Sequence, residues 1–242
     1  MKKNLFLTAL LLASPLALQA REPLTPSTNQ LVEVIDTPTP DVVDHYGYNL
    51  SFRFGKEGGL QNKTLFGVFP RLNIGFGLDG ERVIGTEDAR MNKPTIHVKL
   101  RPFDGAGVLP AIALGFDGQG FHYNRARDEY EQREKGFYLV GGWHPFLPEI
   151  SWNVGVDVFD FDEGDSTRGF TALTYTYRQM VGLMFEWDNF DDRKDRRLNY
   201  GAKVYVTPVF TVDLLARNVP ETYRSKKRET ERLVRLCYTG SF

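Results

Sequence analysis

A two-residue alternation of apolar and polar side chains runs through this chain from about residue 45 to Phe242. In residues 46–54, for example, Tyr, Leu and Phe at even positions alternate with Gly, Asn, Ser and Arg at odd positions. Successive side chains of a β-strand point to opposite faces, so this pattern predicts strands with one apolar and one polar face. A helical period is nearly absent, and the sequence therefore predicts an all-β fold.

The connections between the alternating segments are sorted by length. Long hydrophilic connections at 80–93, 118–135, 159–168, 189–197 and 218–230 alternate with short ones. This sorting is typical of an outer-membrane barrel, with long loops outside and tight turns in the periplasm, whereas a soluble sandwich or lipocalin-like barrel has no reason to sort its loops. The predicted strands are 45–54, 64–79, 94–101, 108–117, 136–143, 149–158, 169–177, 181–188, 198–206, 208–217 and 231–242.

A barrel with both termini in the periplasm needs an even number of strands, and the segments above are eleven. We predict that Gln30–Asp36 is the missing strand, because Leu31, Val32, Val34 and Ile35 make it apolar. The expected fold is a closed antiparallel transmembrane β-barrel of about 12 strands over residues 30–242, with 10 as the fallback.

The first 20 residues have the features of a secretory signal peptide. Lys2 and Lys3 precede an apolar stretch at 5–13, and Leu18-Gln19-Ala20 resembles a cleavage site. A retained N-terminal anchor is the alternative, and residues 21–29 are predicted to be a short flexible lead. The formal net charge of −1 gives no indication of nucleic-acid binding, and a single cysteine excludes an internal disulfide framework. No cofactor or metal site is predicted.

Charged residues on the polar faces of the strands should point into the lumen. Basic residues come from the first strands and acidic ones from later strands, so they could set up a field across the lumen that orients charged or sugar-like solutes. Alternatively, they pair with one another and fill a narrow lumen. The residues are Arg53, Arg71, His97, Lys99, Arg101, Asp117, Asp157, Glu186, Asp188 and Asp213.

The sequence contains few candidate residues for catalysis. A lipid hydrolase or acyltransferase would need a nucleophile and a base, but only His97 lies well inside a predicted strand and no serine has an obvious partner spacing. The protein is therefore predicted not to be an enzyme. The loop 118–135 is predicted to be solvated, with binding of polysaccharide or lipopolysaccharide head groups as the alternative. Cys237 is predicted to be a buried free thiol.

The last strand carries an apolar row that should face lipid. Tyr238 and Phe242 would lie at the depth of an aromatic girdle near the periplasm. A terminal aromatic residue after such a row resembles the signal that barrel-assembly machinery reads. The predicted assembly signal consists of Val234, Leu236, Tyr238 and Phe242.

Several short, glycine-rich strand motifs recur along the chain. They are LNIGFGLD at 72–79, IGT at 84–86, 94–101, PAIALGFD at 110–117, KGFY at 135–138, FEWDN at 185–189 and NYG at 199–201. Together they resemble the YjbH-type outer-membrane β-barrel proteins, whose larger members carry further domains. The resemblance implies a non-enzymatic role in exopolysaccharide secretion or cell-envelope assembly, in the outer membrane of a Gram-negative-type bacterium. It implies outer-membrane lipids, assembly machinery, and a polysaccharide or a secretion-complex protein as partners. A general small-solute pore, porin-like in function, is the alternative.

Overall fold

The structure is a computed structural model that describes residues 30–132, 135–145, 147–160, 166–192, 196–219 and 230–242. The predicted signal peptide, residues 1–20, and the predicted lead, residues 21–29, lie outside the described residues. Among the described residues, no helix is both long enough and apolar enough to cross a membrane.

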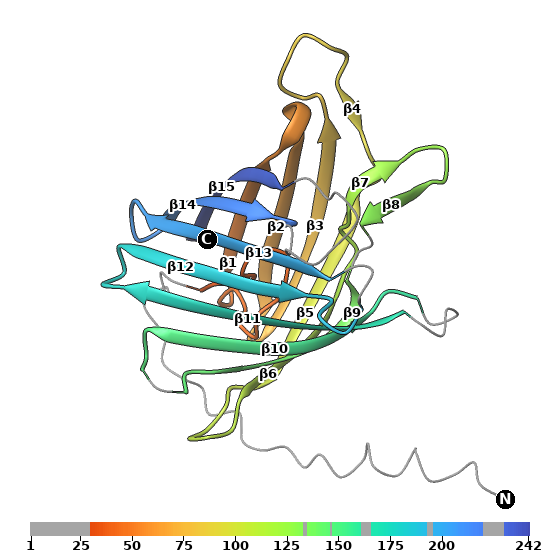
Figure 1. The fold of residues 1–242 in the computed structure, drawn as a ribbon. Helices are drawn as coiled ribbons and strands as arrows, with labels where there is room; N and C mark the ends of the chain where they lie inside the picture. Colours follow the sequence, from red (N-terminus) through yellow and green to blue (C-terminus); the bar gives the residue numbers. More distant parts are fainter. Residues whose placement is uncertain (1–29, 133–134, 146, 161–165, 193–195, 220–229) are drawn as a thin grey trace, which may run out of the picture.

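Twelve strands form a closed barrel in which each strand lies beside its neighbours in the chain, and the last strand pairs with the first (Figure 1). Neighbouring strands alternate in direction around the ring. The β9–β10 boundary is the exception to regular pairing, since its one bridge within the described residues, Gly136 with Val158, has parallel geometry. The barrel strands are β1 Gly47–Phe54, β2 Leu60–Phe69, β3 Leu72–Glu81, β5 Thr95–Phe103, β6 Ala111–Asp117, β9 Gly136–Trp143, β10 Ile150–Val158, β11 Thr167–Tyr177, β12 Val181–Asp188, β13 Arg197–Tyr205, β14 Phe210–Arg217 and β15 Glu231–Ser241.

The two ends of the barrel differ in their connections. One end, called here the long-loop end, carries the connections 82–94, 118–135, 159–166, 189–196 and 218–230. The short-turn end carries the tight turns and both Gly47 and Ser241, which pair with each other. Three short elements lie in connections at the long-loop end: the 3-10 helix η1 Lys56–Gly58, the strand β4 Arg90–Met91, and the hairpin of β7 Phe121–Asn124 with β8 Glu129–Gln132.

The strand count is as predicted, but the predicted position of the twelfth strand is wrong. The predicted strand 64–79 is in fact two strands, β2 and β3, joined by a tight turn at Pro70 and Arg71. Arg71 has a φ of 70°, a left-handed conformation that lets the chain reverse within two residues. Gln30–Asp36, the segment chosen instead, is not part of the barrel wall.

The distribution of side chains in the barrel is the reverse of that in a soluble protein, with apolar residues outside and charged residues inside. In β12, Val181, Leu183, Phe185 and Trp187 are exposed on the outside, while the alternate positions, which include the completely buried Glu186 and Asp188, point inward. Soluble proteins rarely bury charges and do not expose continuous rows of large apolar side chains. Strands that are apolar outside and polar inside are those of a barrel surrounded by lipid.

Residues 30–44, called here the N-terminal segment, lie inside the ring of strands (Figure 1). Val34 and Ile35 are completely buried and pack against Met184, Leu215 and Leu233 of the inner wall. An isolated bridge between Glu33 and Pro38 folds the segment back on itself. The segment therefore fills the middle of the lumen that the strands enclose.

Candidate solute path through the barrel

The carboxylate of Glu186 holds the middle of the N-terminal segment. Its oxygens accept hydrogen bonds from the backbone N–H groups of Ile35 (3.0 Å), Asp36 (2.9 Å) and Thr37 (2.9 Å), and from the Thr37 hydroxyl (2.8 Å). Asn199 on the neighbouring strand β13 donates to the same carboxylate at 2.7 Å. Three consecutive N–H groups around one carboxylate form a strong, charge-assisted contact.

Two polar side chains hold the segment against the opposite wall. The Lys99 ammonium on β5 donates to the backbone carbonyls of Val32 (2.6 Å), Thr39 (3.0 Å) and Asp41 (3.0 Å). The Asn73 amide on β3 accepts from the N–H of Val43 at 2.7 Å and donates to its carbonyl at 2.9 Å. The backbone of the segment is therefore bound on both sides of the lumen, mainly by buried wall residues.

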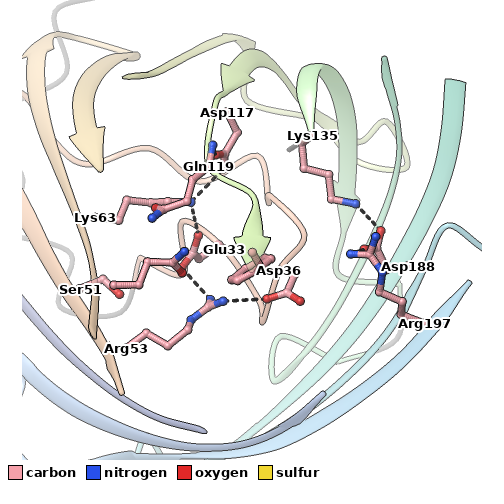
Figure 2. A pocket seen from close by; sticks show the side chains of 12 residues that line it. Glu33, Asp36, Ser51, Arg53, Lys63, Asp117, Gln119, Lys135, Asp188 and Arg197 are labelled. Carbon is pink, nitrogen blue, oxygen red and sulfur yellow. Dashed lines mark hydrogen bonds and ion pairs between the residues drawn. The ribbon is translucent and has the colours of Figure 1, made fainter. Parts of the chain in front are cut away.

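The two carboxylates in the middle of the segment lie among basic residues of the wall (Figure 2). Glu33 contacts Lys63 at 2.8 Å, Arg235 at 3.0 Å and Arg53 at 3.5 Å. Burial alone would raise the pKa of Glu33, but these three cations lower it below its usual value.

Asp36 has a similar environment in the next part of the segment. Its carboxylate contacts Arg53 at 2.8 Å and Arg217 at 2.5 Å. Burial opposes ionisation here too, and the Arg217 and Arg53 guanidinium groups outweigh it and lower the pKa of Asp36. Both segment carboxylates are therefore charged and neutralise basic side chains of the barrel.

Most remaining lumen charges pair within the wall. Asp117 contacts Lys63 at 2.8 Å and His97 at 3.0 Å, and Asp213 contacts Arg235 at 2.7 Å. The other wall pairs are Lys203 with Asp213, and Lys135 and Arg197 with Asp188, with Lys135 also 3.4 Å from Asp157. In these pairs, buried charges of opposite sign lie next to one another and compensate each other locally.

The lumen has a wide cavity at each end and two small cavities between them. The cavity at the short-turn end has a volume of about 1260 Å³, and the one at the long-loop end about 880 Å³. Between them lie cavities of about 20 and 40 Å³, which share the lining residues Glu33, Ser51 and Lys63. These are large enough for one or a few water molecules and too small for a hydrated solute. The barrel is therefore closed at mid-height.

The β7–β8 hairpin covers this closed region from the long-loop end. The Phe121 ring lies 3.6 Å from the Arg217 guanidinium carbon and 5.1 Å from that of Arg53. Gln61 donates to the carbonyl of Gly120 at 3.1 Å, and Arg217 donates to Gln132 at 2.8 Å. Part of the loop predicted to be solvated thus folds over the mouth of the barrel and narrows it.

His122 of this hairpin pairs with Glu231 at the start of β15, which makes the hairpin contact pH-dependent. The hydrogen bond from Glu231 raises the pKa of His122 above its usual value, with Glu131 adding to the effect and burial and Arg217 opposing it. Because the folded-state pKa of His122 is raised, the stabilisation from its charged form is present below about pH 6.5 and is lost as the pH rises through the raised value.

We therefore expect hydrogen exchange in residues 120–132, corrected for intrinsic rates, to increase between about pH 5.5 and pH 8.5. A His122→Gln variant should show no such change. A hairpin whose protection has the same pH dependence in this variant would contradict the assignment.

The structure places most of the predicted lumen charges inside the barrel. Arg71 is the clear departure, since it lies exposed in the β2–β3 turn beside Asp104. Arg101 lies at the short-turn end, close to Asp41 and Asp104. The residues that point into the lumen are Arg53, His97, Lys99, Asp117, Asp157, Glu186, Asp188 and Asp213.

The predicted separation into a basic and an acidic wall is not seen. The prediction missed Lys63 on β2, as well as basic residues from the connection at 118–135 and from later strands, and these pair with the acids. The later-strand residues lie at inward positions of the same alternation, which is the signal that could have identified them. The missed residues are Lys63, Lys135, Arg197, Lys203, Arg217 and Arg235.

The other predicted sites remain without a tested role. Among the described residues, no group of three or more His, Cys, Asp or Glu side chains could hold a metal ion. Cys237 is free, half-buried and 3.8 Å from the Ser51 hydroxyl. In the predicted assembly signal, Val234 and Tyr238 are exposed on the outer face, Leu236 is half-buried, and Phe242 lies against Tyr48 with ring centroids 5.1 Å apart.

Comparison with solved structures supports the fold. A structure titled "KdgM porin" matches with a TM-score of 0.51 and 13% identity over 81% of this chain and 99% of that chain. A structure of the NanC porin matches with a TM-score of 0.43 and 8% identity over 81% of this chain and 99% of that one. The outer membrane channel DcaP of Acinetobacter baumannii has a TM-score of 0.30 at 9% identity, over 81% of this chain and 96% of that one. The first likeness shows a shared barrel fold alone.

No protein-family model matches the chain, and no curated protein matches it. The predicted resemblance to YjbH-type proteins therefore stays a prediction.

Proposed function

We propose that this protein is an outer-membrane channel for small hydrophilic solutes, seen here in a closed state. The observation that carries the proposal is the arrangement of the lumen: two wide cavities open at opposite ends of the barrel, and the N-terminal segment lies between them. The apolar outer face supports a position in the outer membrane, with lipids as its surroundings. The shared barrel fold of a porin structure agrees with this proposal.

Deleting residues 30–44 is the experiment that tests the proposal. The full chain should conduct rarely in planar bilayers, whereas the deleted form should carry a steady current, because residues 30–44 lie across the lumen between the two wide cavities. A deleted barrel that folds, as judged by heat-modifiable migration, and still carries no current would exclude a channel function.

A non-enzymatic role in exopolysaccharide secretion or cell-envelope assembly is the second candidate. It is favoured by the closed lumen itself, since a scaffold that docks a polysaccharide or a secretion-complex protein needs no open path. Recordings of the full chain separate the two, because a channel should open at times whereas a scaffold should stay closed. A lipid-modifying enzyme is a weaker alternative that a lipase assay on the full chain would test.

A further inference from the structure

Three neighbouring strands present basic side chains at nearly the same height inside the barrel. Lys63 lies on β2, Arg53 on β1 and Arg235 on β15, and Arg53 and Arg235 are directly opposite in the β1–β15 register. The two arginines are 7% and 1% exposed. Like charges directly opposite on adjacent strands destabilise a sheet, and burial increases the cost. This part of the wall therefore requires an anion.

The required anion is Glu33, which belongs to the N-terminal segment and not to the wall. One carboxylate oxygen contacts Lys63 at 2.8 Å, and the other contacts Arg235 at 3.0 Å and Arg53 at 3.5 Å. Acidic residues of the wall also contact two of these three cations: Asp117 contacts Lys63, and Asp213 contacts Arg235.

Arg53 depends on the segment more strongly than the other two. Within the described residues, its ion pairs are with Glu33 and Asp36, and its backbone acceptor is the carbonyl of Ile35. If the segment withdrew, Glu33 and Asp36 would leave together, and Arg53 would lose both ionic partners. The wall would then expose an excess of positive charge at this height.

The position of Glu33 makes this site relevant to a solute. Glu33, Ser51 and Lys63 line both small cavities between the two wide ones, and Figure 2 shows Arg53 and Lys63 converging on the Glu33 carboxylate. A solute that crosses the barrel along the inner face of β1 and β2 must pass these cations. Basic side chains at the narrowest part of a pore favour anions over cations.

We propose that Arg53, Lys63 and Arg235 form a binding site for the carboxylate of a small solute, and that Glu33 occupies this site while the N-terminal segment is in place. The carboxylate specificity names a class of solute for the proposed channel, and it rests on that proposed function. The site itself is a property of the folded barrel and can be tested without any current.

Chemical rescue tests the site directly. Glu33→Ala removes the carboxylate, so the melting temperature of the detergent-solubilised protein should fall by roughly 5–10 °C. Sodium acetate should restore most of this loss by supplying a free carboxylate, whereas sodium chloride at equal ionic strength should not. Asp41→Ala is the matched control, because it removes a more exposed carboxylate of the same segment that contacts Arg101 at 3.6 Å, and acetate should not affect it.

Failure of acetate to stabilise Glu33→Ala, or equal rescue by chloride, would overturn the carboxylate site. If Glu33→Ala does not fold, Glu33→Gln keeps the shape of the side chain and removes only its charge. In that case, ion selectivity is measured in place of the rescue by acetate. The barrel lacking residues 30–44 should prefer anions, and Arg53→Gln in that background should reduce the preference. Rescue by acetate together with a non-conducting deleted barrel would reject the channel and leave the site standing.

Discussion

Replacing Glu186 by alanine is expected to raise the open probability of the barrel in planar bilayers by about two orders of magnitude. The substitution leaves the N–H groups of Ile35, Asp36 and Thr37 without their acceptor. Each buried donor without a partner costs about 1–3 kcal/mol, and about 1.4 kcal/mol corresponds to a tenfold change in an equilibrium. Water entering the new cavity offsets part of this cost, so the expected change is smaller than the sum of the three contacts.

The Glu186 prediction has controls within the chain. Glu149→Ala removes an exposed carboxylate from the turn that lines the wide cavity at the short-turn end, so its open probability should match that of the unmodified protein. Glu186→Gln keeps one acceptor oxygen, so its open probability should lie between those of Glu186→Ala and the unmodified protein. If Glu186→Ala stays closed although the barrel is intact, the carboxylate does not hold the segment in place.

The barrel itself was predictable because lipid imposes a period of two on every strand that crosses it. Strands β9 and β12 have the predicted bounds, 136–143 and 181–188. Large apolar residues face outward in both, Phe137 and Leu139 in β9 and Val181, Leu183, Phe185 and Trp187 in β12. The strongest part of the prediction is thus the part that one physical requirement, an apolar outer face, controls along the whole strand.

The place of the N-terminal segment was not predictable from the same pattern. Val34 and Ile35 are apolar because they contact Met184, Leu215 and Leu233 inside the lumen, not because they face lipid. A short extended segment buried in the barrel and a short strand of its wall therefore have similar sequences. The β2–β3 turn was missed because the apolar pattern is hardly interrupted there. Val68 and Phe69 are apolar up to the turn, and Leu72 resumes the pattern just after it.

The pairing of lumen charges depends on the closed ring, which sequence position alone does not give. Arg217 and Asp36 are far apart in the chain, with a separation of 181 residues, and meet only because the segment lies inside the barrel. Alternation identifies which side chains point inward, but it does not indicate which strands face each other or what lies between them. The site at Glu33 depends on the N-terminal segment inside the lumen, so it could be identified only in the structure.

Replacing Arg235 by alanine is expected to destabilise the folded barrel by about 3–5 kcal/mol, because buried Asp213 and Glu33 each lose a cation and the Val34 carbonyl loses its donor. Arg235 is 1% exposed, donates to Asp213 at 2.7 Å and to the carbonyl of Val34 at 2.5 Å, and contacts Glu33 at 3.0 Å. Urea titration in detergent or lipid, followed by tryptophan fluorescence, measures the loss.

Arg71→Ala is the matched control for the Arg235 variant, since it breaks an exposed ion pair with Asp104 and should cost about 0–1 kcal/mol. Arg235→Lys keeps the charge but not the fork of donors, so its stability should be intermediate. Equal losses for Arg235→Ala and Arg71→Ala would mean that water reaches Asp213 and Glu33 freely. The lumen would then not be closed at this height, and the same result would count against the closed state on which the deletion experiment depends.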